Sequence, residues 1–525
     1  MSEDRIVDII VVGAGAAGSV VARRLHDAGA RVLVLEAGGS NEDAMIADPQ
    51  RFFDLVDGPF DWAYRTVPQE HLGGRQLPWA QGHVVGGSSS INGMIWIRGC
   101  AEDFDHWAYL GNPGWSYADL LPLLRRIEDF DRGASEVRGA GGPMPVWSEW
   151  EPDPIHRSVV EAMQELGIPF NHDHNGHEIL GTGYCQYNIR DGRRVSAADA
   201  YLMPVAATQG LELLSGAHVR RLCFEGDRCI GVEWQRGGRL ERACAHGEVV
   251  LTGGVIGSAT LLLRSGVGPA DELAAHGIEV VSDVPGVGEN LHDHVHVPLQ
   301  FATERPVPAS PPGIPPMQTN TFIATDPRMF TPDIQAPSVG ALTRYDGIEP
   351  LAANGFSVSV TILRTASRGR LRLAGPDPDT PPLIDPATYS APGDFDSMLA
   401  GLRLLRALER TAALSEWGAR ELSPGAAVDG EDDLADYARR MTFTASHPVG
   451  TCKMGVDARA VVDPELCVRG VAQLRVADSS IMPTVISGNT HAASIMIGER
   501  ASDLLIAAGR AGGAPVSAPG AAGDG

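Results

Sequence analysis

Residues 6–36 read IVDIIVVGAGAAGSVVARRLHDAGARVLVLE and carry the clearest structural signal in this 525-residue chain. The β-branched run from Ile6 to Val12 predicts a strand, and a helical pattern follows from Ala17 to about Ala28. Residues 32–35 predict a second strand, which ends at Glu36. A strand, a glycine turn, a helix and a second strand with a terminal acidic residue are typical of a βαβ nucleotide-binding unit.

The glycine motif Gly13-x-Gly15-x-x-Gly18 lies at the turn between this strand and helix. Gly13 permits the tight turn, Gly15 lets the backbone approach a pyrophosphate, and Gly18 lets the helix and strand pack closely. The helix N-terminus adds free N–H groups and the positive end of its dipole, which attract phosphate. Glu36 can hydrogen-bond a ribose hydroxyl; a carboxylate there disfavours NADP and does not separate NAD from FAD.

Further apolar strands indicate how the rest of the chain is organised. The stretches that begin at residues 247 and 474 each run from a strand through glycines or a turn into a helical pattern. We therefore expect an α/β fold whose nucleotide-binding domain is discontinuous. Alternating runs such as GFSVSVTILR (355–364) predict a second, mainly antiparallel sheet flanked by helices. The expected division is a nucleotide-binding domain of residues 1–152, 192–298 and 456–508, a substrate domain of residues 153–191 and 299–455, and a disordered tail of residues 509–525.

Composition and charge exclude several classes of protein. The formal net charge is −24, from 42 basic and 66 acidic residues, and no Lys/Arg-rich run is present, which argues against a nucleic-acid partner. No apolar run approaches the roughly 18 residues that a spanning helix needs, so we expect no membrane span. The acidic N-terminus lacks the features of a signal peptide. Seven scattered cysteines without a CxxC pair argue against a disulfide framework or a zinc site, and the cytoplasm is the expected location.

Two further motifs carry candidate chemistry. HVVGGSSSINGMIWIRG (83–99) offers backbone N–H groups and hydroxyls, including that of Ser88, to a phosphate or a ring. Asn92 and Gly93 allow the chain to lie against something flat. SHPVGTCKMG (446–455) places His447 five residues before Cys452, which suits a metal ligand, half of a Cys/His nucleophile pair, or a solitary proton acceptor.

Together these motifs resemble those of the glucose-methanol-choline oxidoreductase family of flavoproteins. The resemblance extends in order over nearly the whole chain, except the tail. It rests on the GxGxxG motif with Glu36, and on GGSSSINGM (86–94), DFDHWAYLGNPGWSYADLLP (103–122), SGVGPADELAAHGIEVVSDVPGVGENLHDH (265–294), SHPVGTCKMG (446–455) and LRVADSSIMPTVISGNTHAASIMIGE (474–499).

The resemblance implies a non-dissociating FAD rather than NAD. Ile91 occupies the place where some members attach flavin through a histidine, so FAD is expected to bind non-covalently. We also expect the side chain of Asn489 or Thr490 to cap the following helix, whose positive end would face the flavin. The expected flavin contacts are Gly13, Gly15, Ala16, Ala17, Gly18, Glu36, Ser88, Asn92, Gly93, the backbone of Val219, Asp478 and Asn489.

The resemblance also gives His447 a role. A histidine at this position in the family takes the hydroxyl proton of an alcohol while hydride leaves for flavin N5, a task that suits imidazole. The family's second catalytic position is expected at His491, which would hydrogen-bond the substrate oxygen. Cys452 has no setting that would make it a nucleophile.

These expectations predict an FAD-dependent enzyme that oxidises a primary alcohol to the aldehyde, an aryl-type alcohol being one candidate. The electron acceptor is oxygen or another acceptor, and paired histidines favour oxygen. A choline-type dehydrogenase with a non-oxygen acceptor is one alternative. A lyase that cleaves hydroxynitriles and keeps FAD as structure is another, and an NAD-dependent dehydrogenase is a third.

Three other features carry weaker predictions. The histidine-rich stretches NHDHNGH (171–177) and LHDHVH (291–296) resemble metal sites in spacing, with His292, His294 and His296 on one strand face. Because the second stretch matches a structural element of the family, we expect no metal there. The proline-rich segment 306–316 predicts a loop that could serve as a lid.

Overall fold

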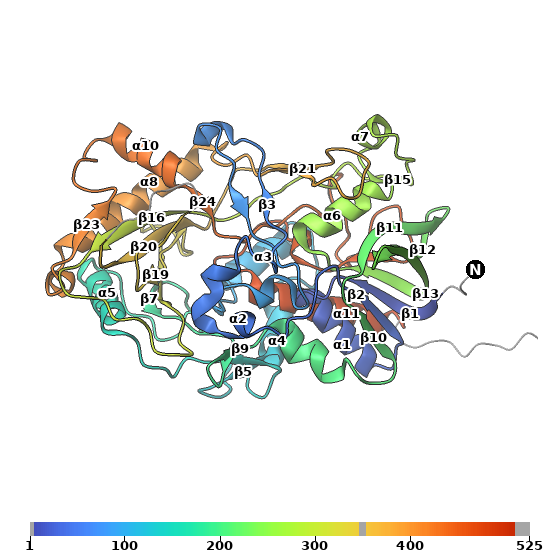
Figure 1. Ribbon diagram of the computed structural model, residues 1–525, viewed down its shortest axis with the longest axis horizontal. Coiled ribbons are helices and arrows are strands. Elements are labelled where there is room, and N and C mark those ends of the chain that lie inside the picture. The colour runs from blue at the N-terminus through green and yellow to red at the C-terminus, as the bar shows by residue number, and fades with distance from the viewer. Residues whose placement is uncertain (1–4, 346–352, 510–525) are drawn as a thin grey trace, which may run out of the picture.

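The computed structural model describes residues 5–345 and 353–509. Figure 1 shows two sheets at opposite ends of an elongated molecule, with helices between and around them. The expected tail lies almost entirely outside the described residues. The α/β fold with a second, antiparallel layer is confirmed.

The first sheet is the one that the βαβ pattern predicted. Its order is β10-β2-β1-β13-β12-β11. Strand β25 pairs with the last residues of β13, beyond β12 and on the edge opposite β1. The pairings of β1 with β2 and β13, of β10 with β2 and of β25 with β13 are parallel, whereas β11, β12 and β13 form antiparallel pairs. The strands are β1 (Arg5–Val12), β2 (Val32–Leu35), β10 (Leu211–Leu214), β11 (His218–Glu225), β12 (Arg228–Arg236), β13 (Arg239–Leu251) and β25 (Leu474–Val476).

Two helices pack together beside this sheet. Helix α1 (Ala16–Asp27) buries Val20, Val21 and Leu25, and it packs against α11 (His491–Ala507). A Cβ atom at Gly498 of α11 would lie 2.7 Å from the Ala17 carbonyl oxygen, so the contact needs a glycine there. Because α11 belongs to the C-terminal motif and α1 to the N-terminal one, this packing joins the two ends of the chain.

The second sheet is antiparallel throughout. Its order is β18-β17-β19-β20-β16-β23, with β24 paired to β16 and β7 to β17. The strands are β7 (Gly181–Tyr184), β16 (Val295–Ala302), β17 (Met317–Ile323), β18 (Ile334–Gln335), β19 (Ser338–Val339), β20 (Gly355–Ile362), β23 (Arg420–Ser423) and β24 (Phe443–Thr444). The expected domain boundary after residue 298 falls inside β16, all of which belongs to this sheet.

Helices α5 (Pro154–Glu165), α8 (Pro392–Arg406) and α10 (Glu431–Met441) pack against the second sheet. The remaining helices are α2 (Ala44–Ala47), α3 (Ala101–Tyr109), α4 (Tyr117–Ile127), α6 (Gly254–Arg264), α7 (Ala270–Ala275) and α9 (Ala412–Ser415). Short strand pairs complete the fold: β3 (Tyr64–Arg65) with β4 (Pro78–Trp79), β5 (Glu128–Phe130) with β6 (Met144–Val146), β8 (Ile189–Arg190) with β9 (Arg193–Arg194), β14 (Val267–Gly268) with β15 (Ser282–Asp283), and β21 (Arg370–Arg372) with β22 (Leu383–Asp385).

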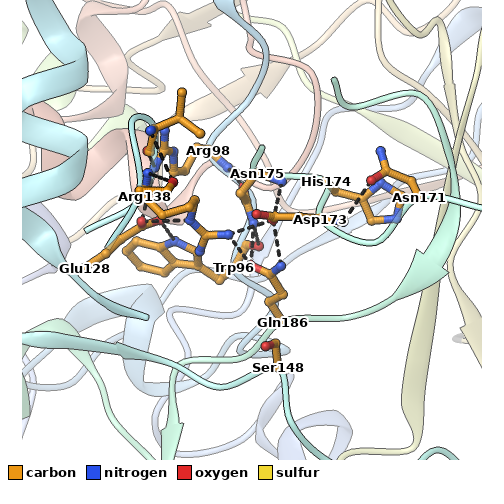
Figure 2. Close-up of polar contacts among 12 residues, drawn as sticks. Trp96, Arg98, Glu128, Arg138, Ser148, Asn171, Asp173, His174, Asn175 and Gln186 are labelled. Atoms are coloured by element: carbon orange, nitrogen blue, oxygen red, sulfur yellow. Dashed lines mark hydrogen bonds and ion pairs between the residues drawn. The ribbon is translucent and has the colours of Figure 1, made fainter. Parts of the chain in front are cut away.

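A buried polar network fastens the loop of residues 171–177 in place, as Figure 2 shows. Glu128 accepts hydrogen bonds from Arg98 (3.1 Å) and Arg138 (3.0 Å), and Arg138 also donates to Asp173 (2.6 Å). Asn175 accepts from the Arg98 backbone N–H at 2.7 Å. Because Glu128 and both guanidinium groups are buried, removal of one partner would leave an uncompensated charge, which makes this anchor costly to break.

The segment 306–316 contains no helix or strand, so the predicted loop is confirmed. Gln50 donates to the carbonyl oxygens of Ser310 (2.6 Å) and Pro311 (3.1 Å), and the Ser310 hydroxyl donates to Asp153 (2.7 Å). The loop is thereby fixed at its middle. Its service as a lid stays a prediction.

Candidate active site

The glycine motif forms one wall of a large cleft at the carboxyl ends of the parallel strands. Gly13 has φ +104°, and a Cβ atom there would lie 2.6 Å from the Thr252 carbonyl oxygen. A Cβ atom at Gly18 would lie 2.0 Å from the Gly13 carbonyl oxygen. At Gly15, by contrast, nothing lies closer than 3.9 Å to the Cβ position. Gly13 and Gly18 are therefore required by the fold, whereas a side chain at Gly15 is excluded by no protein atom.

The cleft has a volume of about 640 Å³ and collects most of the sequence-predicted cofactor contacts. Gly18 instead packs between helix and strand, and Asn92, Gly93 and Asn489 also lie outside the lining. Sequence reasoning missed Trp62, Tyr64, His218 and Arg264, which also line the cleft. The eight predicted residues that line it are Gly13, Gly15, Ala16, Ala17, Glu36, Ser88, Val219 and Asp478.

Glu36 lies at the end of β2 with its carboxylate in the cleft wall. One carboxylate oxygen accepts from the Ala14 N–H and the other from the Gly38 N–H, each at 2.8 Å. Burial raises the pKa of Glu36 to about 7, although the two backbone hydrogen bonds oppose the shift. Each oxygen keeps a further lone pair, so the carboxylate can accept a ribose hydroxyl as well.

Asp478 follows β25 and connects the cleft to helix α6. Its carboxylate accepts from the Gly254 N–H (2.9 Å), the Ser258 hydroxyl (2.6 Å) and the Ser480 N–H (2.8 Å). Burial raises the pKa of this carboxyl group, whereas these hydrogen bonds lower it. The glycine motif, the buried carboxylate of Glu36 and the N-terminus of α1 together fit a dinucleotide with a pyrophosphate and a ribose, as FAD has.

The segment around Ile91 is fixed by its own contacts. Asn92 accepts from Arg194 at both its side-chain oxygen (2.8 Å) and its backbone oxygen (2.6 Å). Phe52 is the nearest neighbour of a Cβ atom built at Gly93. Ile91 packs with Ile46, Leu55 and Val84 in a small apolar cluster. An aliphatic side chain at position 91 cannot bond a flavin.

His447 lies just beyond β24, and both of its ring nitrogens have partners. Its Nε2 is 3.0 Å from Asn489 Nδ2, and its Nδ1 is 3.1 Å from Nδ1 of His294. Gln335 donates to the Asn489 side-chain oxygen at 3.2 Å, which leaves the Asn489 amide nitrogen as the donor to His447. Nε2 therefore carries the lone pair of a neutral ring, and its proton is on Nδ1, shared with His294.

Burial keeps this ring neutral. It lowers the pKa of His447 to about 4, and neighbouring His296 acts in the same direction. The backbone N–H of His447 donates to Asp293 at 2.8 Å, which fixes the loop in which the ring is held. A neutral imidazole with an Nε2 lone pair beside an amide donor can accept a proton from a hydroxyl group.

His491 lies in a different environment. It is the first residue of α11, is 9% exposed, and its ring is edge-on to that of Trp96 at 5.7 Å. The side chains that hydrogen-bond His447 are those of Asn489 and His294. The expected hydrogen bond from His491 to the substrate oxygen stays a prediction. The expected cap is wrong: Thr490 is the N-cap of α11 without a side-chain hydrogen bond, and the Asn489 side chain contacts His447.

Other sequence hypotheses for this region can now be placed. Cys452 is completely buried and burial raises the pKa of its thiol, so it is not set up as a nucleophile. In the 171–177 loop, His174 has the carbonyl oxygens of Ile179 and Asn320 as partners. Within residues 5–345 and 353–509, no group of three or more His, Cys, Asp or Glu side chains is arranged to hold a metal.

Comparisons with known proteins agree with this site. The chain is 37% identical over 524 residues to an oxygen-dependent choline dehydrogenase of Brucella anthropi, covering 95% of each chain. It is 38% identical to the mitochondrial choline dehydrogenase of Homo sapiens, covering 94% of this chain and 89% of that one. The crystal structure of pyridoxine 4-oxidase from Mesorbium loti superposes with a TM-score of 0.90 at 35% identity, covering 94% and 98%.

No helix in the described part of the chain has the length and apolar character needed to cross a membrane.

Residues 7–296 match the N-terminal model of the GMC oxidoreductase family, and residues 365–498 match the C-terminal one. The chain therefore belongs to the GMC oxidoreductase family and is an FAD-dependent oxidoreductase of alcohols.

Proposed function

We propose that this protein oxidises a primary alcohol to the aldehyde with His447 as the base. The observation that carries the proposal is the pair of contacts made by the His447 ring: Nε2 lies 3.0 Å from the Asn489 amide nitrogen, which can only donate, so the lone pair is assigned to Nε2. A hydroxyl group in the same place could give its proton to Nε2.

FAD would be held by the cleft, with Gly15 and the α1 N-terminus at its pyrophosphate and Glu36 at a ribose. When bound, it supplies the acceptor for the two electrons and the hydrogen that leave the alcohol carbon. We propose that it is bound non-covalently, because Ile91 offers no attachment. We also propose that the segments of the first sheet form the FAD-binding domain and those of the second sheet the substrate domain.

The side chains around the reacting oxygen would act in sequence. His447 Nε2 accepts the hydroxyl proton, and Asn489 Nδ2 donates to the substrate oxygen as negative charge develops on it. The N-terminus of α11 begins at His491, directly after these groups, and its positive dipole end favours the same charge. His294 Nδ1 accepts a hydrogen bond from the His447 Nδ1–H and so holds the ring in the productive tautomer.

The relatives suggest two kinds of substrate and two kinds of acceptor. Choline is a permanent cation, whereas pyridoxine carries its alcohol on an aromatic ring. An oxidase passes electrons to oxygen, and a dehydrogenase of the choline type can use another acceptor. The expected preference for oxygen rests on His447 and His491 acting together on the substrate, and it stays a prediction.

The test is an anaerobic screen of alcohols against the purified protein, followed by admission of oxygen. We expect a primary alcohol to bleach the flavin absorbance and to yield the aldehyde. Peroxide formed on admission of oxygen would identify an oxidase. A flavin that stays yellow with every alcohol while a hydroxynitrile is cleaved would identify a lyase and overturn the proposal.

A further inference from the structure

The side-chain amide of Asn489 is hydrogen-bonded at both ends. Its Nδ2 lies 3.0 Å from His447 Nε2, and its Oδ1 accepts from Gln335 Nε2 at 3.2 Å. The oxygen and nitrogen ends of an amide have almost the same shape, so packing alone does not decide which end faces His447. The hydrogen-bond partner at the far end of the amide decides it.

Gln335 is itself fixed by its neighbours in the second sheet. It is the last residue of β18, where its backbone pairs with Phe322 of β17 and with Thr361 of β20. Its side chain is buried, and its Nε2 also donates to Oδ1 of Asn320 on β17 at 3.0 Å. Strand pairing therefore fixes the backbone of Gln335, and the bond to Asn320 fixes its amide.

Both hydrogens of the Gln335 amide nitrogen are used in this arrangement. One is donated to Asn320 and the other to Asn489, and each of these partners presents an oxygen. An amide nitrogen only donates, whereas an amide oxygen only accepts. If the Gln335 amide were turned round, its oxygen would face two other oxygens. The bond to Asn320 therefore keeps the nitrogen of Gln335 toward Asn489.

The orientation of Asn489 determines which nitrogen of His447 can accept a proton. A neutral imidazole has one N–H and one lone pair. With the Asn489 nitrogen toward it, His447 Nε2 carries the lone pair. With the Asn489 oxygen in that place, the ring would be stabilised with its hydrogen on Nε2, and this nitrogen could no longer take the proton of an alcohol.

We propose that Gln335 is a positioning residue for proton transfer: it fixes the Asn489 amide with its nitrogen toward His447 and thereby keeps the lone pair on His447 Nε2. The inference rests on the proposed function, in which Nε2 is the base. Gln335 acts through Asn489 rather than on the substrate. The second sheet would then determine the tautomer of the base.

Gln335→Glu tests the proposal, because it keeps the shape of the side chain and replaces the donor by an acceptor. The carboxylate would accept from Asn489 Nδ2 and so turn the Asn489 oxygen toward His447. Since a positioned general base contributes about 10² to 10⁴ in rate, we expect the limiting rate of flavin reduction to fall by about 10²-fold or more. The assay is anaerobic stopped-flow reduction of the holoenzyme by benzyl alcohol, or by choline where benzyl alcohol does not reduce the wild type.

Gln335→Met removes the donor without putting an acceptor in its place. The Asn489 amide is then free to face either way, and only one orientation leaves the lone pair on His447 Nε2. Because the rate scales with the fraction of molecules in the competent orientation, reduction should slow by only about 2- to 10-fold. A loss in Gln335→Met as large as that in Gln335→Glu would show that the amide orientation is not what matters and would overturn the proposal.

Gln300→Glu is the matched control for the cost of a buried carboxylate. Gln300 lies in the same sheet, on β16, and is 3% exposed, as is Gln335. Its amide donates to the backbone oxygen of Thr343 and not to a residue that contacts His447. Both Glu variants are expected to lower the melting temperature, and Gln300→Glu should leave the reduction rate within about threefold of the wild type. An equal loss of rate in the two Glu variants, with FAD bound in both, would reduce Gln335 to a structural role.

Nitrogen-15 NMR of protein labelled at histidine reports which ring nitrogen carries the hydrogen, and it needs no turnover. The His447 signals are those that are absent from the spectrum of His447→Gln. We expect the hydrogen on Nδ1 in the wild type and on Nε2 in Gln335→Glu. Gln335→Met is expected to show both positions, and it gives the same test if the carboxylate of Gln335→Glu unfolds the chain.

The NMR measurement separates failure of this inference from failure of the proposed function. If no alcohol reduces the flavin, the proposed function fails, and the spectra still report whether Gln335 sets the tautomer of His447. If the hydrogen stays on the same nitrogen in the folded Gln335 variants as in the wild type, the inference is overturned, even where the enzyme oxidises alcohols.

Discussion

Substitution of His447, Asn489 and His491 tests which side chains act on the substrate. Asn489 contacts His447 in the structure, whereas the family motif predicts His491 as the second catalytic residue. His447→Ala removes the proton acceptor, and a positioned general base contributes about 10² to 10⁴ in rate. We expect flavin reduction to slow by that factor. FAD should stay bound, because His447 is absent from the lining of the cofactor cleft.

The expected magnitudes for the other two positions follow from their contacts. Asn489 donates one hydrogen bond at the position of developing charge, and such a bond is worth about 1.5–3 kcal/mol. Since about 1.4 kcal/mol corresponds to a factor of ten, Asn489→Ala should slow reduction by roughly 10- to 100-fold. His491 instead packs edge-on to Trp96, so His491→Ala should lower the melting temperature and change the reduction rate by less than about threefold.

Anaerobic stopped-flow measurement of the limiting reduction rate is the assay, with the flavin to protein ratio and the melting temperature as controls. His491→Asn is the matched variant, because it keeps a polar side chain without the ring. A rate for His491→Ala that is lower than that for Asn489→Ala would show that His491 acts on the substrate. It would refute the assignment of that role to Asn489. Near wild-type reduction by His447→Ala, with FAD fully bound, would refute the base itself.

Three further outcomes are expected. The neutral ring of His447 is the proton acceptor, and burial lowers its pKa to about 4. The reduction rate should therefore be flat from about pH 9 to pH 6 and be lost as the pH falls through about 4. At pH 5.5 the ring would be ~3% protonated, against ~90% for an ordinary histidine, so a midpoint near 6.5 in the pH profile would contradict the shift. Acid denaturation should release FAD into the supernatant, since Ile91 cannot bond it; flavin retained by the precipitate would show a covalent link elsewhere. Removal of the residues after about Ala508 should leave activity and melting temperature nearly unchanged, and a large loss in either measurement would assign the tail a packing role.

Strands β1, β2, β13 and β25 of the first sheet could be predicted because their signals are local, whereas β10, β11 and β12 were not predicted. The run from Ile6 to Val12, the glycine motif and Glu36 each depend on a few neighbouring residues: a strand period, a positive φ at Gly13, and a close approach at Gly18. One wall of the cleft could be predicted for the same reason, since residues 12–17 and Glu36 belong to this unit. Trp62 reaches the cleft from a segment that carries no such pattern.

The tertiary structure alone decided which residues surround His447. Its partners lie 153 and 42 positions away, at His294 and Asn489, and no local pattern specifies those contacts. The motif SGNTHAAS contains Asn489 and His491, and the sequence does not say which of them faces the base. Asn489 precedes the N-cap Thr490, whereas His491 is the first residue of α11, so no helical period relates the directions of these two side chains. The packing of α11 against α1 fixes the position of His491, whose ring lies edge-on to Trp96, and the non-helical residues before α11 bring the Asn489 amide to His447.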